Sequence, residues 1–151
     1  MNTLKQRLTD DVKAAMLAGD ALRVECLRGL KSVILYAEVA ANKRDEGLDD
    51  TEIEALFAKE VKKRQESADL YVRGGSQERA DKELAEKAII EQYLPQQLSA
   101  EEIERVIDDV ISQTGASGMQ AMGRVIGEVK KRCGNTADGS IIATVVKEKL
   151  S

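Results

Sequence analysis

The stretch that decides how this chain is divided is Glu91-Gln92-Tyr93-Leu94-Pro95-Gln96-Gln97-Leu98-Ser99. Pro95 is the only proline in the sequence. Because proline lacks an N–H and clashes with the preceding turn, a helix that runs into Pro95 must end there. Ser99 and Glu102 then have the spacing of a capping box, which marks the start of a new helix. We therefore predict a joint between an N-terminal helical domain, residues 1–92, and a second helical domain, residues 93–151.

The composition is that of a helical protein. Of the 151 residues, 33% are charged and only 3% are aromatic, and Ala, Leu, Glu, Lys, Arg and Val dominate. Residues of this kind favour helices over sheets. We predict an all-α fold, with an N-terminal antiparallel helical bundle followed by a small three-helix domain. The net charge of −4 gives no global attraction to nucleic acid, so any such binding needs a local basic patch.

Four helices are expected before the joint, since apolar residues recur there at intervals of three and four. The expected breaks are Gly19, the polar loop 42–50 and the pair Gly74-Gly75. The glycine pair lacks the context of a phosphate-binding loop and is interpreted as a turn. At the end of this region, Tyr93 and Leu94 are expected to pack across the joint and hold it rigid.

Three helices are expected after the joint. The first ends near Gly115, and the second is opened by Ser117 or Gly118. This second helix contains Gly123 and Gly127, and glycine in a helix interior is about 1 kcal/mol less favourable than alanine. We therefore expect another backbone to approach these glycines closely, and their spacing leaves open whether it belongs to a neighbouring helix or to a nucleic acid.

The last two helices form the one basic region of the chain. From residue 118 to 151 there are six bases and three acids, while the preceding helix is acidic. The run Lys130-Lys131-Arg132 ends a helix and precedes the turn at Gly134. Phosphate groups fit such a cluster, and the N–H groups of residues 138–140 at the start of the final helix are expected to point at the same anion.

Several classes of chemistry have no residues to support them. The chain has no histidine, which removes the commonest general base and metal ligand. Cys26 and Cys133 stand alone inside helical patterns and are interpreted as small buried apolar residues. We predict no metal site, no cofactor and no catalytic residue. With neither a signal peptide nor an apolar run of membrane length in the sequence, we expect a cytoplasmic protein without a membrane partner.

Several motifs of the chain resemble those of a known family. The motifs are Gln92 to Ser99 with Glu101-Glu102-Ile103, then Met122-Gly123-Arg124-Val125-Ile126-Gly127-Glu128-Val129-Lys130, Gly134, Ala137-Asp138-Gly139, and Val145 to Leu150. They resemble the YqeY family and the tail domain that this family shares with GatB, the B subunit of the glutamyl/aspartyl-tRNA amidotransferase. The sequence departs from the family at Ile126, where methionine is common, and at residues 133–136, where a lysine-richer turn is expected.

The resemblance implies a two-domain helical protein whose tail faces RNA. In GatB the tail domain helps to hold the tRNA, and amide transfer occurs in a catalytic core that this chain lacks. The family-level label is carbon–nitrogen ligase activity with glutamine as amido-N-donor. Because this sequence offers no catalytic residues, we expect that activity to belong to the neighbouring core. Carried over by position, the residues expected to contact RNA are Gly123, Arg124, Gly127, Lys130, Lys131, Arg132, Gly134 and Lys147.

Two functional hypotheses follow, and a third is weaker. The first is a non-catalytic, tRNA-binding accessory protein related to the tRNA-dependent amidotransferase. The second is a protein–protein docking module for an amidotransferase or an aminoacyl-tRNA synthetase. The third, an enzyme with glutamine amide chemistry, has no residues in this sequence to which we can assign the catalysis.

Overall fold

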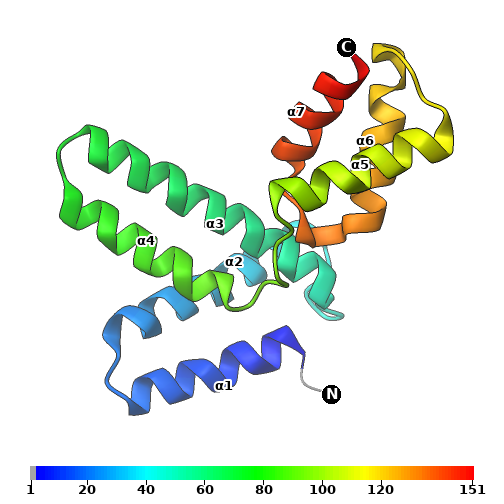
Figure 1. The fold of residues 1–151 in the computed structure, drawn as a ribbon. Helices are drawn as coiled ribbons and strands as arrows, with labels where there is room; N and C mark the ends of the chain where they lie inside the picture. Colours follow the sequence, from blue (N-terminus) through cyan, green and yellow to red (C-terminus); the bar gives the residue numbers. More distant parts are fainter. Residues whose placement is uncertain (1–2) are drawn as a thin grey trace. The chain divides into compact units, whose positions relative to one another are not determined.

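The computed structural model describes residues 3–151, and these residues form seven α-helices and no strand (Figure 1). The all-α fold class is therefore confirmed. The helices are α1 (Leu4–Leu17), α2 (Ala21–Ala40), α3 (Asp50–Arg73), α4 (Gln77–Glu91), α5 (Ala100–Thr114), α6 (Met122–Cys133) and α7 (Gly139–Leu150). They belong to two compact units, of which the first ends at Leu94 and the second begins at Pro95. Within the described residues, no helix is both long and apolar enough to cross a membrane.

Short polar side chains start the helices of the first unit, as the sequence indicates. The side chains of Thr3 and Asp20 each accept a hydrogen bond from the backbone N–H three residues later. Asp49 and Glu52 form a reciprocal capping box at the start of α3. These bonds satisfy N–H groups that have no partner within the helix. The predicted breaks at Gly19 and Gly74-Gly75 lie where α1 and α3 end.

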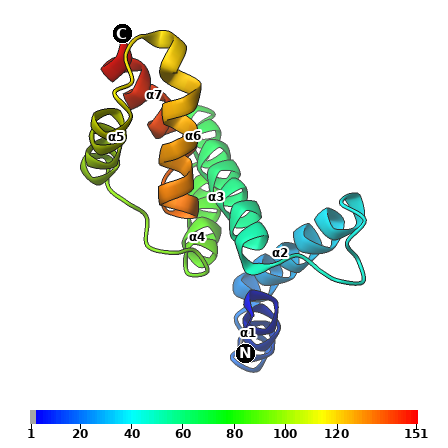
Figure 2. The same ribbon diagram turned by 90° about the vertical axis from the view of Figure 1, so that its right-hand side faces the viewer.

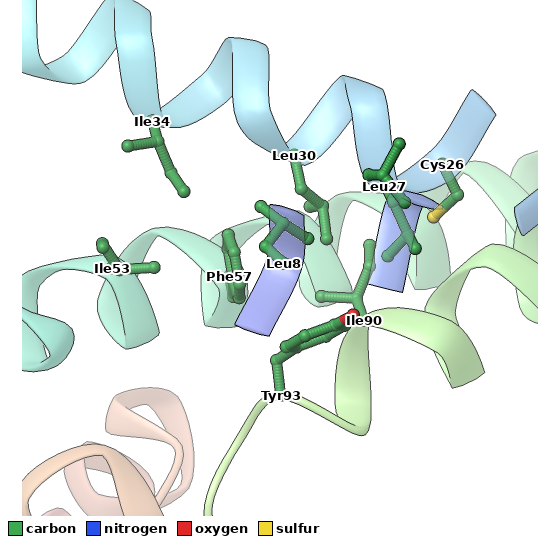
Figure 3. Packing of buried hydrophobic residues seen from close by; sticks show 10 residues of the cluster. Leu8, Cys26, Leu27, Leu30, Ile34, Ile53, Phe57, Ile90 and Tyr93 are labelled. Carbon is green, nitrogen blue, oxygen red and sulfur yellow. The ribbon is translucent and has the colours of Figure 1, made fainter. Parts of the chain in front are cut away.

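The first unit consists of two helical hairpins, α1–α2 and α3–α4, packed around one apolar core. Figure 3 shows the buried side chains converging from all four helices. The core residues are Leu8, Val12, Cys26, Leu27, Leu30, Ile34, Ile53, Phe57, Ile90 and Tyr93. Burying a side chain of this size contributes about 1.5–3 kcal/mol. This one face per helix is the apolar stripe that the periodicity predicts.

Tyr93 is a core residue of the first unit, which corrects the expectation that it packs across the joint. Only 3% of Tyr93 is exposed, and its ring meets Phe57 edge-on with 5.9 Å between ring centroids. The guanidinium of Arg7 lies 4.6 Å from the centre of the Tyr93 ring, and the phenol donates a hydrogen bond to Asp11. Leu94 packs against the same core. Because α1 supplies both a cation and a carboxylate, the first unit holds Tyr93 by itself.

Gln92 is bound to α1, as Tyr93 is, and also to α2. Its backbone oxygen accepts a hydrogen bond of 2.9 Å from Arg7 Nη2, and its Oε1 accepts one of 3.1 Å from Arg23 Nη2. The chain that leaves α4 is thus attached to α1 and α2 as far as Leu94. The sequence placed the end of the first domain at residue 92, and the compact unit of the structure ends two residues later.

The other half of the joint is bound within the second unit. Gln97 Nε2 donates a hydrogen bond of 2.9 Å to the backbone oxygen of Asn135, and the N–H of Leu98 donates one of 2.7 Å to Thr136. Ser99 and Glu102 form the predicted capping box of α5. The residues before Pro95 are therefore bound to the first unit, and the residues after it are bound to the second.

The second unit is a bundle of α5, α6 and α7 around its own apolar cluster. In Figures 1 and 2 the C-terminus lies beside the turn that links α5 to α6. The start of α6 differs from the prediction. Gly118 has a φ of +79°, outside the helical region, and a 3-10 turn over Met119–Ala121 separates it from the first residue of α6, Met122.

Candidate nucleic-acid interface

The exposed side of α6 is the candidate interface. Val125, Val129 and Cys133 are buried and turn one side of the helix toward the core of the second unit. Residues three or four apart share a face of a helix, so the opposite side carries a different set. That exposed set consists of Gly123, Arg124, Gly127, Lys130 and Lys131. Five of the eight residues expected to contact RNA therefore lie together on one face.

The two helical glycines lie open to solvent. Of the two alternatives for a close neighbour, a helix or a nucleic acid, the second unit therefore supplies no helix. A Cβ atom added at Gly123 or at Gly127 would meet nothing within 4 Å. No other helix of the second unit comes close to them, because α6 packs through its opposite, valine-bearing side. The glycines therefore serve no packing role within the second unit, and they leave a strip of bare helix backbone between basic side chains.

Arg124, Lys130 and Lys131 have no ion-pair partner among the described residues. The side chain of Lys130 extends toward the first residue of α7, where its Nζ lies 3.7 Å from the position that a Cβ of Gly139 would take. Three uncompensated positive charges thus surround the glycine strip. Such a group attracts anions.

Arg132 is occupied inside the second unit. Its Nη1 lies 3.0 Å from Asp109 Oδ2, its Nη2 donates to Gln113, and its Nε lies 3.6 Å from Glu128 Oε1. Asp109 and Gln113 are on α5, so the guanidinium braces α6 against α5. A fork of this kind positions a helix.

The turn after α6 and the start of α7 are shaped by their own contacts. Gly134 has φ +57° and ψ −132°, a backbone conformation that glycine adopts readily and other residues do not. At the start of α7 the carboxylate of Asp138 accepts the N–H of Ser140 at 2.7 Å. One N–H that was expected to face a phosphate is therefore already bound to a carboxylate. Lys147 is exposed on α7, and no interaction in the described chain joins it to the bases of α6.

Sequence reasoning missed the pairing of the acidic α5 with the bases that pack against it. Lys149 Nζ lies 2.8 Å from Glu104 Oε1 and 3.1 Å from Asp108 Oδ1, and these hydrogen bonds raise the pKa of Lys149. Lys149 and Arg132 are both paired with acidic residues of α5. Part of the positive charge of the second unit is therefore neutralised within that unit. The Glu128–Arg132 spacing of four was a visible sign that Arg132 had a local partner.

The two thiols are buried, as the sequence interpretation has it. Burial is the main cause that raises the pKa of Cys26 to about 11, and it also raises the pKa of Cys133. Neither sulfur is a thiolate near neutral pH, and the thiolate is the form that attacks. Among residues 3–151, no three Cys, Asp or Glu side chains gather as metal ligands would.

Comparison with known proteins identifies related chains. The family model of Yqey-like proteins matches residues 5–150. The E subunit of the glutamyl-tRNA(Gln) amidotransferase from Thermococcus gammatolerans is 40% identical over 57 residues, which is 35% of this chain and 9% of that protein.

Two fungal relatives are longer matches. Altered inheritance of mitochondria protein 41, mitochondrial, is 34% identical over 97 residues in Lachancea thermotolerans and 34% over 86 residues in Kluyveromyces lactis. These matches cover 64% and 57% of this chain, and 51% and 45% of the relatives, so the chain spans about half their length. Their names place those proteins in mitochondria, and a cytoplasmic location for this chain stays a prediction.

Proposed function

This chain belongs to the family of Yqey-like proteins, and from that membership together with the exposed basic face of α6 we propose that it is a tRNA-binding accessory protein of tRNA-dependent amidation. The second unit would contact the RNA, and the first unit would serve another role. The link to amidation rests on the segment similar to part of an amidotransferase that acts, by its name, on glutamyl-tRNA(Gln).

One observation carries the proposal: bare helix backbone at Gly123 and Gly127 lies between unpaired cations. Without a Cβ at these positions, a sugar–phosphate backbone can reach van der Waals contact with the helix. Arg124 and Lys131 on one side of the glycines and Lys130 on the other could then each meet a phosphate oxygen. Phosphate contacts of this kind fix position and register and carry no sequence information. We therefore expect binding governed by RNA shape and salt.

Within the proposed interface Arg132 and Gly134 have supporting roles. Arg132 keeps α6 against α5 through Asp109, so it fixes where the glycine face points. Gly134 allows the sharp turn that brings the start of α7 beside Lys130. Lys147 remains a proposed contact on α7, at the edge of the surface.

Salt dependence of tRNA binding tests the proposal. Filter binding with total tRNA compares the natural chain with the double variant Lys130→Ala/Lys131→Ala over a range of salt concentrations. Each lost phosphate contact lowers the slope of log affinity against log salt by about 0.7–0.9. The double variant should lose up to two such contacts, and its affinity should fall most at low salt.

A matched control removes the same charge elsewhere. Lys13 and Lys82 are exposed on α1 and α4, in the first unit, and Lys13→Ala/Lys82→Ala has the same net charge as the site variant. This control should keep the salt slope of the natural chain. Binding that is insensitive to salt, or equal losses in the two double variants, would show that the α6 face is not the contact.

A neutral substitution tests the role of the bare backbone. Gly127→Gln adds a side chain into open space, so it leaves the fold and the charge intact. It should weaken tRNA binding by obstructing the close approach while the salt slope changes little. Unchanged affinity for this variant would refute contact between RNA and the helix backbone.

A further inference from the structure

The outer face of α2 carries apolar side chains that nothing in the described chain covers. Leu35, Tyr36 and Val39 are 47%, 76% and 55% exposed. They are one, three and four residues apart, so they share one face of the helix. Single exposed apolar residues are normal, whereas a contiguous group that includes an aromatic ring is typical of a contact surface.

The same face contains small residues one and two turns earlier. Gly29 is in the interior of α2, and a Cβ added there would meet nothing within 4 Å. Ser32 is also exposed and lies between Gly29 and the apolar group. A glycine here weakens the helix by about 1 kcal/mol relative to alanine and improves no packing inside the chain. The free space it leaves fits an approach from outside.

This face of α2 is complementary to the same face of a second copy that runs antiparallel to it, with the two helices crossing at Ser32. An antiparallel copy of α2 centred on Ser32 places Leu35 opposite Gly29, and Tyr36 opposite Arg28. The large side chain of each pair thus meets a small one or a cation. A guanidinium over an aromatic ring is a favourable contact, and the dipoles of antiparallel helices also attract.

A hollow on the α1–α2 hairpin lies at the matching place. It has a volume of about 520 Å³ and is lined by Ala15, Met16, Gly19, Ala21, Val24, Glu25 and Arg28. In the antiparallel arrangement, residues 24–28 of one chain face residues 36–40 of the other. The Tyr36 ring and the Val39 side chain of a second copy would therefore enter this hollow. There the thioether of Met16, which lies 3.5 Å from Arg28 Nη2, is a favourable neighbour for an aromatic ring.

Every pair in this arrangement occurs twice, because each chain offers the same face of α2 to the other. An interface in which each surface meets its own copy about a two-fold axis has this reciprocity.

We propose that the outer face of α2 is the interface of a homodimer, in which two α2 helices pack antiparallel about Ser32. The surface is on the first unit, whereas the RNA-binding face proposed for α6 is on the second. Each chain inserts Tyr36 and Val39 into the hollow of the other, and Leu35 fills the space beside Gly29.

Sedimentation velocity over a range of protein concentrations, without RNA, tests the dimer. As the concentration rises, the mass derived from sedimentation of the natural chain should approach twice the 16.5 kDa of a single chain. Tyr36→Glu should raise the dimer dissociation constant at least about tenfold, since it removes a buried aromatic anchor twice per dimer. The matched control is Leu70→Glu on α3, where a similarly exposed apolar residue, 64% exposed, is replaced by the same acid. This control should dimerise like the natural chain.

Two further variants define the register. Gly29→Gln should raise the melting temperature of the monomer, since it improves the helix, and still weaken the dimer. Ser32→Cys should form a disulfide-linked dimer under mild oxidation, because the two-fold axis places the two sulfurs together and the native thiols are buried. Leu70→Cys should not.

Three outcomes would overturn the proposal. The first is a single-chain mass at every concentration, as expected if a different protein covers this face. The second is a dimer that Tyr36→Glu leaves intact, and the third is a dimer in which Ser32→Cys does not cross-link. Loss of tRNA binding in the Lys130→Ala/Lys131→Ala variant with the dimer unchanged would keep the two proposals separate.

Discussion

Replacing Tyr93 by phenylalanine should measurably destabilise the first unit, although the change removes a single oxygen. The phenol donates to the carboxylate of Asp11, and a hydrogen bond to a charged group contributes about 1.5–3 kcal/mol when it is buried. The side chain of Asp11 is 32% exposed, so water replaces part of the lost bond. We expect a loss of about 1 kcal/mol from the free energy of unfolding. The packing against Phe57 remains, because the ring is unchanged.

Urea unfolding followed by far-ultraviolet circular dichroism measures this loss. Since the two units can unfold in separate transitions, Leu27→Ala identifies the transition of the first unit through its fully buried side chain. The control is Tyr71→Phe, which removes the same oxygen from a tyrosine of α3 that is only partly buried. A Tyr93→Phe variant within about 0.5 kcal/mol of Tyr71→Phe would refute the role assigned to the hydrogen bond.

Tyr93→Phe should also change how the stability of the first unit depends on pH in the alkaline range. Burial, and then the hydrogen bond to Asp11, raise the pKa of Tyr93 above its ordinary value of 10.0. The folded state therefore holds the phenolic proton more tightly than the unfolded chain. This contribution is complete below pH 10.0 and is lost as the pH rises beyond it, by up to about 1.4 kcal/mol per pH unit. Tyr93→Phe should lack this additional loss, and equal pH slopes in the two proteins would contradict it.

Three further substitutions test local features. Ser99→Ala removes the cap of α5 and should lower the stability of the second unit by about 1 kcal/mol in urea unfolding. Glu38→Gln should destabilise the first unit near neutral pH only. The hydrogen bond from Lys5 lowers the pKa of Glu38, so the contribution of this carboxylate to stability is present above pH 4.5 and is lost as acid protonates it in the folded state. In acid the variant and the natural chain should therefore have similar stability. Thermal unfolding should show opposite signs for two glycines, with Gly127→Ala gaining about 1 kcal/mol in an open helix interior and Gly134→Ala losing about 1–3 kcal/mol from strain at positive φ.

Helix boundaries were largely readable from the sequence because their causes are local. Asp20, Asp49 and Ser99 cap helices through side chains that reach only three residues ahead. Gly115 ends α5 with a φ of +64°, a conformation that glycine alone adopts at little cost. The start of α6 was less readable, since a 3-10 turn and an α-helix have similar short-range patterns and Gly118 fits either.

The partners of individual side chains were not readable in this way. The spacing of Glu128 and Arg132 indicated a local partner, yet no local pattern showed that Arg132 also reaches Asp109 across the bundle. Which cations stay free depends on how α6 is rotated against α5, and that rotation is set by the packing of apolar residues from three helices. For the same reason the spacing of Gly123 and Gly127 could not show that both face solvent.

The sequence by itself determined that the chain is helical, that a helix ends before Pro95 and that another begins at Ser99, because these depend on covalent geometry and on bonds within one turn. Only the tertiary structure decided what the residues around Pro95 do. Tyr93 enters the core of the first unit because Arg7, Asp11 and Phe57, distant in sequence, together form the site that holds its ring. Leu98 is held in the second unit by the backbone oxygen of Thr136, nearly 40 residues later. Contacts of this kind depend on how whole helices pack, and no local pattern specifies them.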